Sequence, residues 1–299
     1  EKLLIEIIKD DPLHLEARKE LSSLYSRNGD YDQSLSIANT GLQIDAYHIG
    51  LNYCAGIAYM ASKDWINAKE HLGWAARSMA YRSTANTLLA QINMIEKKYK
   101  DAKHYNDIAL KYNTENINAL SQQALLYRIM GEKENAIQTI SAIEKIDPIN
   151  HLAVYEKHLL GEADKNAVRD SHKSEFPYQT FLELALFYHN RNQNSEAIKI
   201  LKSGPKHLLN SLWLAYLNQN HMALSALDDE SIAFVFPFRR ESLNMMEWVV
   251  ANHPSWKAKY LMGLNLMGRA QTERGIEIFK DLGQTPKDHL FYFIRGMLF

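Results

Sequence analysis

The chain has 299 residues, 46% of them hydrophobic and 23% charged, which is the balance of an ordinary folded protein. Its 34 basic and 35 acidic side chains give a formal net charge of −1, so no global field favours nucleic acid or an anionic membrane. No apolar run is long enough to cross a bilayer, and the single cysteine, Cys54, excludes an internal disulfide and a thiolate metal cluster.

Helical patterns begin at the first residue. The opening run EKLLIEIIKDDP has the pattern of the second helix of a hairpin. We therefore expect the array to begin in mid-repeat and the chain to be a fragment of a longer protein. Four helical hairpins are predicted after it, at about 15–48, 49–82, 83–116 and 117–150.

The hairpin at 117–150 shows the pattern most clearly. Its first helix has apolar residues at steps of three and four, including Ala124 and Tyr127. Gly131 ends this helix, because glycine adopts the left-handed conformation found at helix C-termini. The second helix carries a similar stripe from Ala136 and stops before Pro148, because the residue before a proline is forced out of helical geometry.

The same sites recur at intervals of 34 residues. Counting back from Tyr127 gives Asn93, Tyr59 and Tyr25. Small residues fill two further sites of the period, which are Ala124, Ala90, Gly56 and Ser22 in the first helices and Ala136, Ala102, Ala68 and Ser34 in the second. Small side chains let two helices approach closely, and one hairpin cannot bury both of its faces alone, so neighbouring hairpins must stack.

Small, aromatic, small and, less regularly, proline sites at this period resemble the tetratricopeptide repeat (TPR) family. The resemblance implies an all-α fold, an α-solenoid of stacked antiparallel helix pairs that forms a right-handed superhelix. We predict a regular TPR array at 1–150 that begins in mid-repeat. Degenerate TPR-like helical repeats are predicted at 151–299, within the same continuous solenoid.

The register slips after residue 150. We predict a short helix at 151–160, a polar connector at 161–175, a new hairpin from Phe176, and a last full hairpin at about 254–283. Arg239 and Arg240 are expected in the first turn of a helix at about 240–252, where the helix dipole disfavours cations. We therefore expect a negatively charged or hydrogen-bond-accepting group beside these arginines, either a structural partner within the chain or a ligand anion.

A narrower resemblance covers residues 234–269, FVFPFRRESLNMMEWVVANHPSWKAKYLMGLNLMGR. The Phe-Pro-Phe-Arg entry, Trp248, and Ser255-Trp256 before Tyr260 and Gly263 resemble the tail of certain large bacterial proteins. Those proteins join an N-terminal β-rich, mutarotase-like domain of unknown function to a C-terminal TPR region. The resemblance implies that any sugar chemistry belongs to a domain outside this sequence, so no catalytic residue is carried over.

Motifs that carry chemistry are missing from the sequence. None of the 12 histidines has His-Glu-x-x-His spacing, and the chain contains no GxSxG, phosphate loop or GxGxxG. Cys54 lies beside Ala55 and Gly56 on an expected first helix, so we expect a buried, inert thiol. We predict no enzymatic activity, no cofactor and no metal site. A single cysteine is equally compatible with a protein of the cytoplasm and with a protein of a bacterial periplasm, so the sequence does not indicate the compartment.

In the TPR family the first helices line the concave face, and the second, fifth, ninth and twelfth residues of each repeat point into it. We predict a peptide-binding site at such positions, formed by Tyr53, Ile57, Met60, Gln91, Met94, Leu125 and Arg128. Exposed aromatic and methionine side chains suit adaptable recognition, and Arg128 could pair with a carboxylate of the bound segment. The alternative is that superhelix curvature packs these residues against each other.

A carboxylate clamp of the kind found in some TPR proteins is not expected. Lys19 occupies one clamp site, but Ser23, Thr84 and Leu88 stand where its partners would be.

The sequence favours a non-catalytic TPR scaffold that mediates protein–protein or interdomain binding through its concave face. Its partner would be a protein segment or its own missing N-terminal domain, with no nucleic acid and no membrane span. The alternative is an accessory helical region of a carbohydrate-active enzyme whose catalytic domain is absent. Self-association through exposed ends is also expected, because apolar side chains there lack a neighbouring helix, namely Leu3, Leu4, Ile7, Ile8, Phe291, Phe293 and Leu298.

Overall fold

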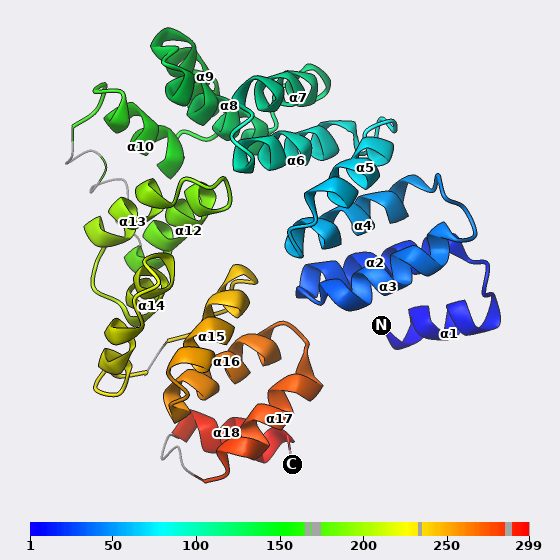
Figure 1. Ribbon diagram of the computed structural model, residues 1–299, viewed down its shortest axis with the longest axis vertical. Helices are drawn as coiled ribbons and strands as arrows, with labels where there is room; N and C mark the ends of the chain where they lie inside the picture. Colours follow the sequence, from blue (N-terminus) through cyan, green and yellow to red (C-terminus); the bar gives the residue numbers. More distant parts are fainter. Residues whose placement is uncertain (165–167, 169–174, 233–234, 285–288, 299) are drawn as a thin grey trace. The chain divides into compact units, whose positions relative to one another are not determined.

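The computed structural model describes residues 1–299 except 165–167, 169–174, 233–234, 285–288 and 299. Within the described residues the regular elements are helices and no strand occurs, which confirms the predicted all-α class (Figure 1). No described helix is long and apolar enough to cross a membrane. The bounds of the described helices are α1 (Lys2–Asp10), α2 (Leu15–Asn28), α3 (Tyr31–Leu42), α4 (Ile49–Ala61), α5 (Trp65–Ala75), α6 (Arg82–Ile95), α7 (Tyr99–Tyr112), α8 (Ile117–Met130), α9 (Lys133–Ile146), α10 (His151–Leu159), α12 (Pro177–His189), α13 (Asn194–Ser203), α14 (Leu208–Leu217), the 3₁₀ helix η1 (His221–Leu227), α15 (Glu241–Asn252), α16 (Trp256–Gly268), α17 (Thr272–Leu282) and α18 (His289–Leu298).

The helices form two compact units. Unit 1 holds residues 1–175 and 190–192, and unit 2 holds residues 176–189 and 193–299. The predicted division at residue 150 and the predicted continuity of the solenoid stay predictions. In unit 1 the pairs α2/α3, α4/α5, α6/α7 and α8/α9 pack as successive hairpins, and each second helix contacts the first helix of the next pair (Figure 1).

Side-chain caps repeat with the 34-residue period of the sequence. The residues before α2, α4, α8 and α10 each accept a hydrogen bond from the backbone N–H three residues on, at 3.0–3.2 Å, and they are His14, His48, Asn116 and Asn150. An N-cap acceptor satisfies one of the free amides of the first turn. The period is broken at position 82, where Arg82 is the first residue of α6 rather than its cap.

The turn inside each hairpin repeats as well. A residue one or two positions after each first helix has a positive φ, which is 74° at Gly29, 62° at Lys63, 61° at Lys97 and 77° at Gly131. The next amide then donates to the carbonyl at the aromatic site of the repeat, as from Asp64 N to Tyr59 O at 2.9 Å. This bond pattern is the Schellman motif, in which a left-handed residue closes the helix end.

Two of these left-handed positions carry lysine instead of glycine. We expect Lys63→Gly and Lys97→Gly each to raise the free energy of unfolding by about 0.5–1 kcal/mol. An L-residue in the left-handed conformation costs the folded state about 1–2 kcal/mol, and glycine removes that cost. This gain is larger than the loss of stability that comes from the greater conformational entropy of glycine in the unfolded chain. Urea denaturation measures the change. Gln138→Gly, in the interior of α9, is the control and should lower stability by about 1 kcal/mol; a loss at both turn sites as well would contradict the assigned backbone conformation.

Small residues let the paired helices of unit 1 approach closely. Ala68, Ala102 and Ala136 are fully buried on the second helices, and Ala124 is fully buried on α8. At Gly56, a Cβ atom would lie 2.7 Å from Leu72 Cγ, so only glycine fits without displacing that leucine. The predicted small-residue sites are therefore the contact sites of the hairpins.

Unit 2 has the pairs α12/α13 and α16/α17 together with less regular helices. Arg239 and Arg240 precede α15, whose first residue is Glu241, so their predicted place in the first helical turn is wrong. Arg239 instead forms an ion pair with Glu183 of α12, a structural acceptor of the kind expected.

The predicted exposure of Phe291 is also wrong. Its ring is fully buried, with its centroid 5.9 Å from that of Tyr260 and 5.8 Å from that of Phe279. Phe293 is 63% exposed and Leu3 of α1 is 67% exposed. Most of the connector predicted at 161–175, and the side chain of Leu298, lie outside the described residues.

Candidate functional site

The seven predicted binding residues come from three first helices of unit 1. Tyr53, Ile57 and Met60 lie on α4, Gln91 and Met94 on α6, and Leu125 and Arg128 on α8. The α4 residues are three or four positions apart, so they share one face of that helix. All three α4 side chains are half-buried, as is Gln91. We call the surface formed by Glu16, Lys19, Tyr53, Ile57 and Met60 the first-helix face.

The remaining predicted residues have structural contacts. Met94 and Leu125 are fully buried. The Arg128 guanidinium binds the Glu156 carboxylate of α10 through two hydrogen bonds, Nε to Oε2 at 2.5 Å and Nη2 to Oε1 at 3.1 Å. Glu156 is 0% exposed. Arg128 therefore pairs with a carboxylate, but one of its own chain.

Helices α2 and α4 come close together at Gly50. A Cβ atom there would lie 2.5 Å from Lys19 Cδ, so the absence of a side chain leaves room for the lysine stem. The rings of Tyr53 and Tyr81 lie 4.8 Å apart at an angle of 45° beside this contact. Burial raises the pKa of Tyr81 above its ordinary value, so this hydroxyl stays protonated at neutral pH.

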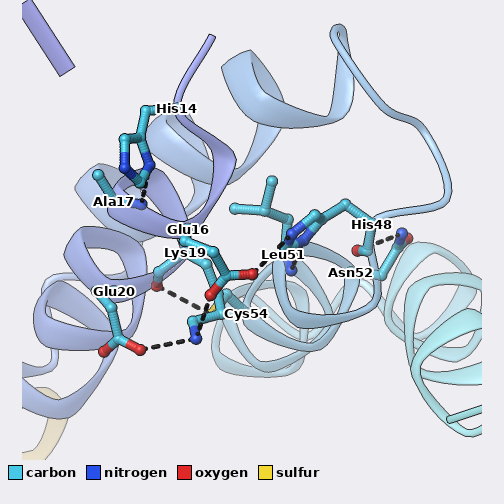
Figure 2. Close-up of polar contacts among 9 residues, drawn as sticks. All are labelled: His14, Glu16, Ala17, Lys19, Glu20, His48, Leu51, Asn52 and Cys54. Atoms are coloured by element: carbon cyan, nitrogen blue, oxygen red, sulfur yellow. Dashed lines mark hydrogen bonds and ion pairs between the residues drawn. The ribbon is translucent and has the colours of Figure 1, made fainter. Parts of the chain in front are cut away.

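Figure 2 shows the charged cluster at the start of this face. The Lys19 ammonium lies 2.7 Å from Glu16 Oε2 and 2.7 Å from Glu20 Oε1. The hydrogen bond from Lys19, with its positive charge, lowers the pKa of Glu16, and the two carboxylates raise the pKa of Lys19. The carboxylates are well exposed, at 62% and 52% of the side chain, whereas Lys19 is only 21% exposed. The charge offered to solvent is therefore negative.

His48 connects this cluster to the backbone of α4. Its Nδ1 accepts from Leu51 N at 3.2 Å, and its Nε2 lies 3.3 Å from Glu16 Oε1 (Figure 2). These contacts place the ring proton on Nε2, because an atom that accepts a hydrogen bond carries no proton. The sequence signal for this histidine was its spacing of 34 residues from His14, which caps α2 in the same way.

Cys54 is buried beneath the same face. Its Sγ donates to Lys19 O at 3.9 Å (Figure 2), and burial raises the pKa of the thiol. A thiol that resists ionisation is a poor nucleophile, as predicted. No group of three or more His, Cys, Asp or Glu side chains in the described part of the chain could hold a metal ion.

Half-buried histidines should make the stability pH-dependent. Burial lowers the pKa of His71, His151 and His207 in the folded protein. A depressed pKa means that the unfolded chain binds protons more readily, so stability falls as the pH drops below the ordinary histidine value of about 6.5. We expect a lower melting temperature at pH 5.5 than at pH 7.5, and a smaller decrease in His71→Gln. An equal decrease in that variant would exclude His71 as a contributor.

Stacked antiparallel helix pairs with a 34-residue period of caps, turns and contacts define unit 1 as an α-solenoid of TPR-like repeats. No family model and no curated protein sequence matches the chain.

Solved structures of TPR proteins are similar to it. YrrB, described as a TPR protein with an unusual peptide-binding site, is 16% identical over 75% of this chain and 97% of its own, with a TM-score of 0.45. MamA is 19% identical over 63% of this chain and 88% of its own, with a TM-score of 0.42. A tetratricopeptide repeat protein from Parabacteroides merdae is 18% identical over 83% of this chain and 96% of its own, with a TM-score of 0.36.

Proposed function

We propose that the protein is a non-catalytic scaffold that binds a polypeptide segment along the first-helix face of unit 1. The observation that carries the proposal is the row of half-buried Tyr53, Ile57 and Met60 on one face of α4. These side chains remain partly open to solvent although the hairpin cores are closed by small residues. A bound segment would bury the rest of their apolar surface, which is the main favourable term in association.

The seven predicted residues would contribute differently. Tyr53, Ile57 and Met60 would contact the segment directly, whereas the Gln91 amide already donates to Asn190 O at 3.0 Å and would hold the fold. Met94 and Leu125 are fully buried and would hold the helices in place. Arg128 would mainly stabilise the fold through its ion pair with Glu156. A substitution of Arg128 would therefore change stability as well as binding and would not test the binding site cleanly.

The charges favour a cationic side chain in the bound segment. Lys19 already forms ion pairs with Glu16 and Glu20, and the two negative charges of these exposed carboxylates outweigh its single positive charge. A lysine or arginine of the segment would therefore be attracted to this end of the face. A C-terminal carboxylate would be repelled, in agreement with the absence of a predicted clamp.

A domain outside this sequence is the second candidate partner. The resemblance of residues 234–269 to the tails of large bacterial proteins supports an accessory role beside a β-rich domain. Any chemistry on carbohydrate would belong to that domain and not to the helical repeats. Self-association through α1 and α18 stays a prediction, based on the exposed side chains of Leu3 and Phe293.

A peptide-library selection tests the proposed binding. Peptides enriched on the wild-type chain are labelled, and their affinity is measured by fluorescence anisotropy. We expect Tyr53→Ala combined with Ile57→Ala to weaken a selected basic peptide by at least tenfold. Ile66→Ala is the matched control, because Ile66 is 81% exposed on α5, a second helix, and its loss should leave the affinity unchanged.

Circular dichroism and the urea midpoint verify that both variants are folded. Equal affinity of the double variant and the wild type would reject the first-helix face as the binding site. Destabilisation of the double variant with unchanged peptide affinity would show that Tyr53 and Ile57 serve only the core.

A further inference from the structure

A second exposed surface lies along the loops that join one hairpin of unit 1 to the next. It contains aromatic, methionine and arginine side chains that the first-helix face does not use. We call it the loop edge, and its members are Tyr47, Trp74, Arg77, Met79, Arg82 and Tyr112. Its residues come from the loop that precedes α4, from α5, from the loop between α5 and α6, from α6 and from α7.

The loop edge is continuous through contacts between its members. The rings of Tyr47 and Trp74 have centroids 4.6 Å apart. The Arg77 guanidinium lies 3.8 Å from the centroid of the Trp74 ring. Arg82 then donates to Arg77 O at 2.7 Å, lies 3.1 Å from Met79 Sδ and sits 4.5 Å above the Tyr112 ring.

Four of the six side chains of the loop edge are exposed, and Trp74 and Arg82 are half-buried. Tyr47 is 63% exposed, Met79 72% and Tyr112 44%. Asp45 Oδ1 accepts from Tyr47 N at 2.9 Å, which fixes the loop that presents Tyr47. A loop backbone that is already fixed loses little further conformational entropy when a partner binds.

Arg77 supplies the charge that defines the partner. It is exposed, and it forms no ion pair with any residue that the structure describes. Its guanidinium is oriented by Trp74, and cation–π stacking leaves the edge N–H groups free to donate. Arg82 is engaged differently, because its Nε and Nη2 donate to the carbonyls of Ala76 and Arg77 at the end of α5.

We infer that the loop edge binds a short acidic peptide segment, with a carboxylate on Arg77 and an adjacent apolar side chain against Tyr47 and Met79. A guanidinium and a carboxylate make paired, charge-assisted hydrogen bonds, and Tyr, Trp and Arg dominate the strong contacts of protein interfaces. Nucleic acid is the less favoured occupant. It needs several cations that follow the phosphates, whereas Arg77 and Arg82 are the two cations of the loop edge and Arg82 is already bonded to the carbonyls of Ala76 and Arg77.

The inference is tested in the chain that carries Tyr53→Ala and Ile57→Ala, so that its outcome does not depend on the first-helix face. A random heptapeptide display library is selected on this chain and counter-selected on the same chain with Arg77→Gln added. We expect enrichment of aspartate and glutamate over the input library. A synthetic selected peptide should lose at least tenfold in affinity when Arg77→Gln or Tyr47→Ala is introduced.

Controls separate the possible occupants. Lys100→Gln removes one exposed charge from α7 outside the loop edge and should leave the affinity unchanged. Peptides with a free or an amidated C-terminus distinguish a terminal carboxylate from a side-chain carboxylate. No acidic enrichment, or equal affinity of Arg77→Gln, would overturn the inference. It would be overturned as well if a labelled oligoadenylate of equal length bound more tightly than the acidic peptide and depended on Arg77.

Discussion

Ala124→Trp is expected to lower the free energy of unfolding by about 1–3 kcal/mol or more, because overpacking a closed core forces side chains off their rotamers and shifts the backbone. Ala124 is fully buried on α8, at the small-residue site where this helix meets its partner α9. The urea denaturation midpoint measures the effect. In a repeat array the loss should extend to the neighbouring hairpins, because each hairpin is stabilised by the next.

Asn118→Trp is the matched control for this substitution. Asn118 is exposed on the same helix, so the same side chain placed there should change stability by no more than about 0.5 kcal/mol. Equal midpoints for the two tryptophan variants would show that Ala124 is not at a helix contact and that the assigned register is wrong.

Arg128→Ala should also be severely destabilising, by about 3–5 kcal/mol, which is typical when one member of a buried ion pair is removed. The reason is that Glu156, 0% exposed on α10, would lose its two hydrogen bonds to the guanidinium. A carboxylate taken out of water without this compensation favours the unfolded chain. Thermal unfolding followed by circular dichroism measures the loss.

The double variant Arg128→Ala, Glu156→Gln shows where the destabilisation comes from. Removing the negative charge should restore a large part of the stability, because a neutral amide is less costly to bury than a carboxylate. If the double variant is as unstable as Arg128→Ala, the loss comes from the packing of the arginine stem and not from the lost ion pair.

The 34-residue period predicted the hairpins because each structural feature of a hairpin is local. The small residues at Ala68, Ala102 and Ala136, and the aromatic site at Tyr59 whose carbonyl closes the Schellman turn, are set by contacts within about one repeat. Lys63 and Lys97 take the left-handed conformation that Gly29 and Gly131 adopt, although lysine gives no sign of it. Their spacing in the period was the available signal.

The candidate site was less predictable because it depends on contacts between repeats. A position within a helix indicates that Arg128 faces away from α9, but not that Glu156, 28 residues later, faces back towards it. The same limit applies to Lys19, whose role was set by Glu16, Glu20 and the nearby Gly50. The loop edge was missed because Tyr47, Trp74 and Arg77 belong to different elements and meet only in the fold.

Amide hydrogen exchange with a selected basic peptide tests the binding function most directly. The wild-type chain is compared with and without the peptide, and protection is mapped onto the helices of unit 1. We predict slower exchange in α2 and α4, whose side chains form the first-helix face, and unchanged exchange in α3, α5 and α7. Protection confined to the second helices, or none at saturating peptide, would contradict the proposal that this chain binds a segment along its first helices.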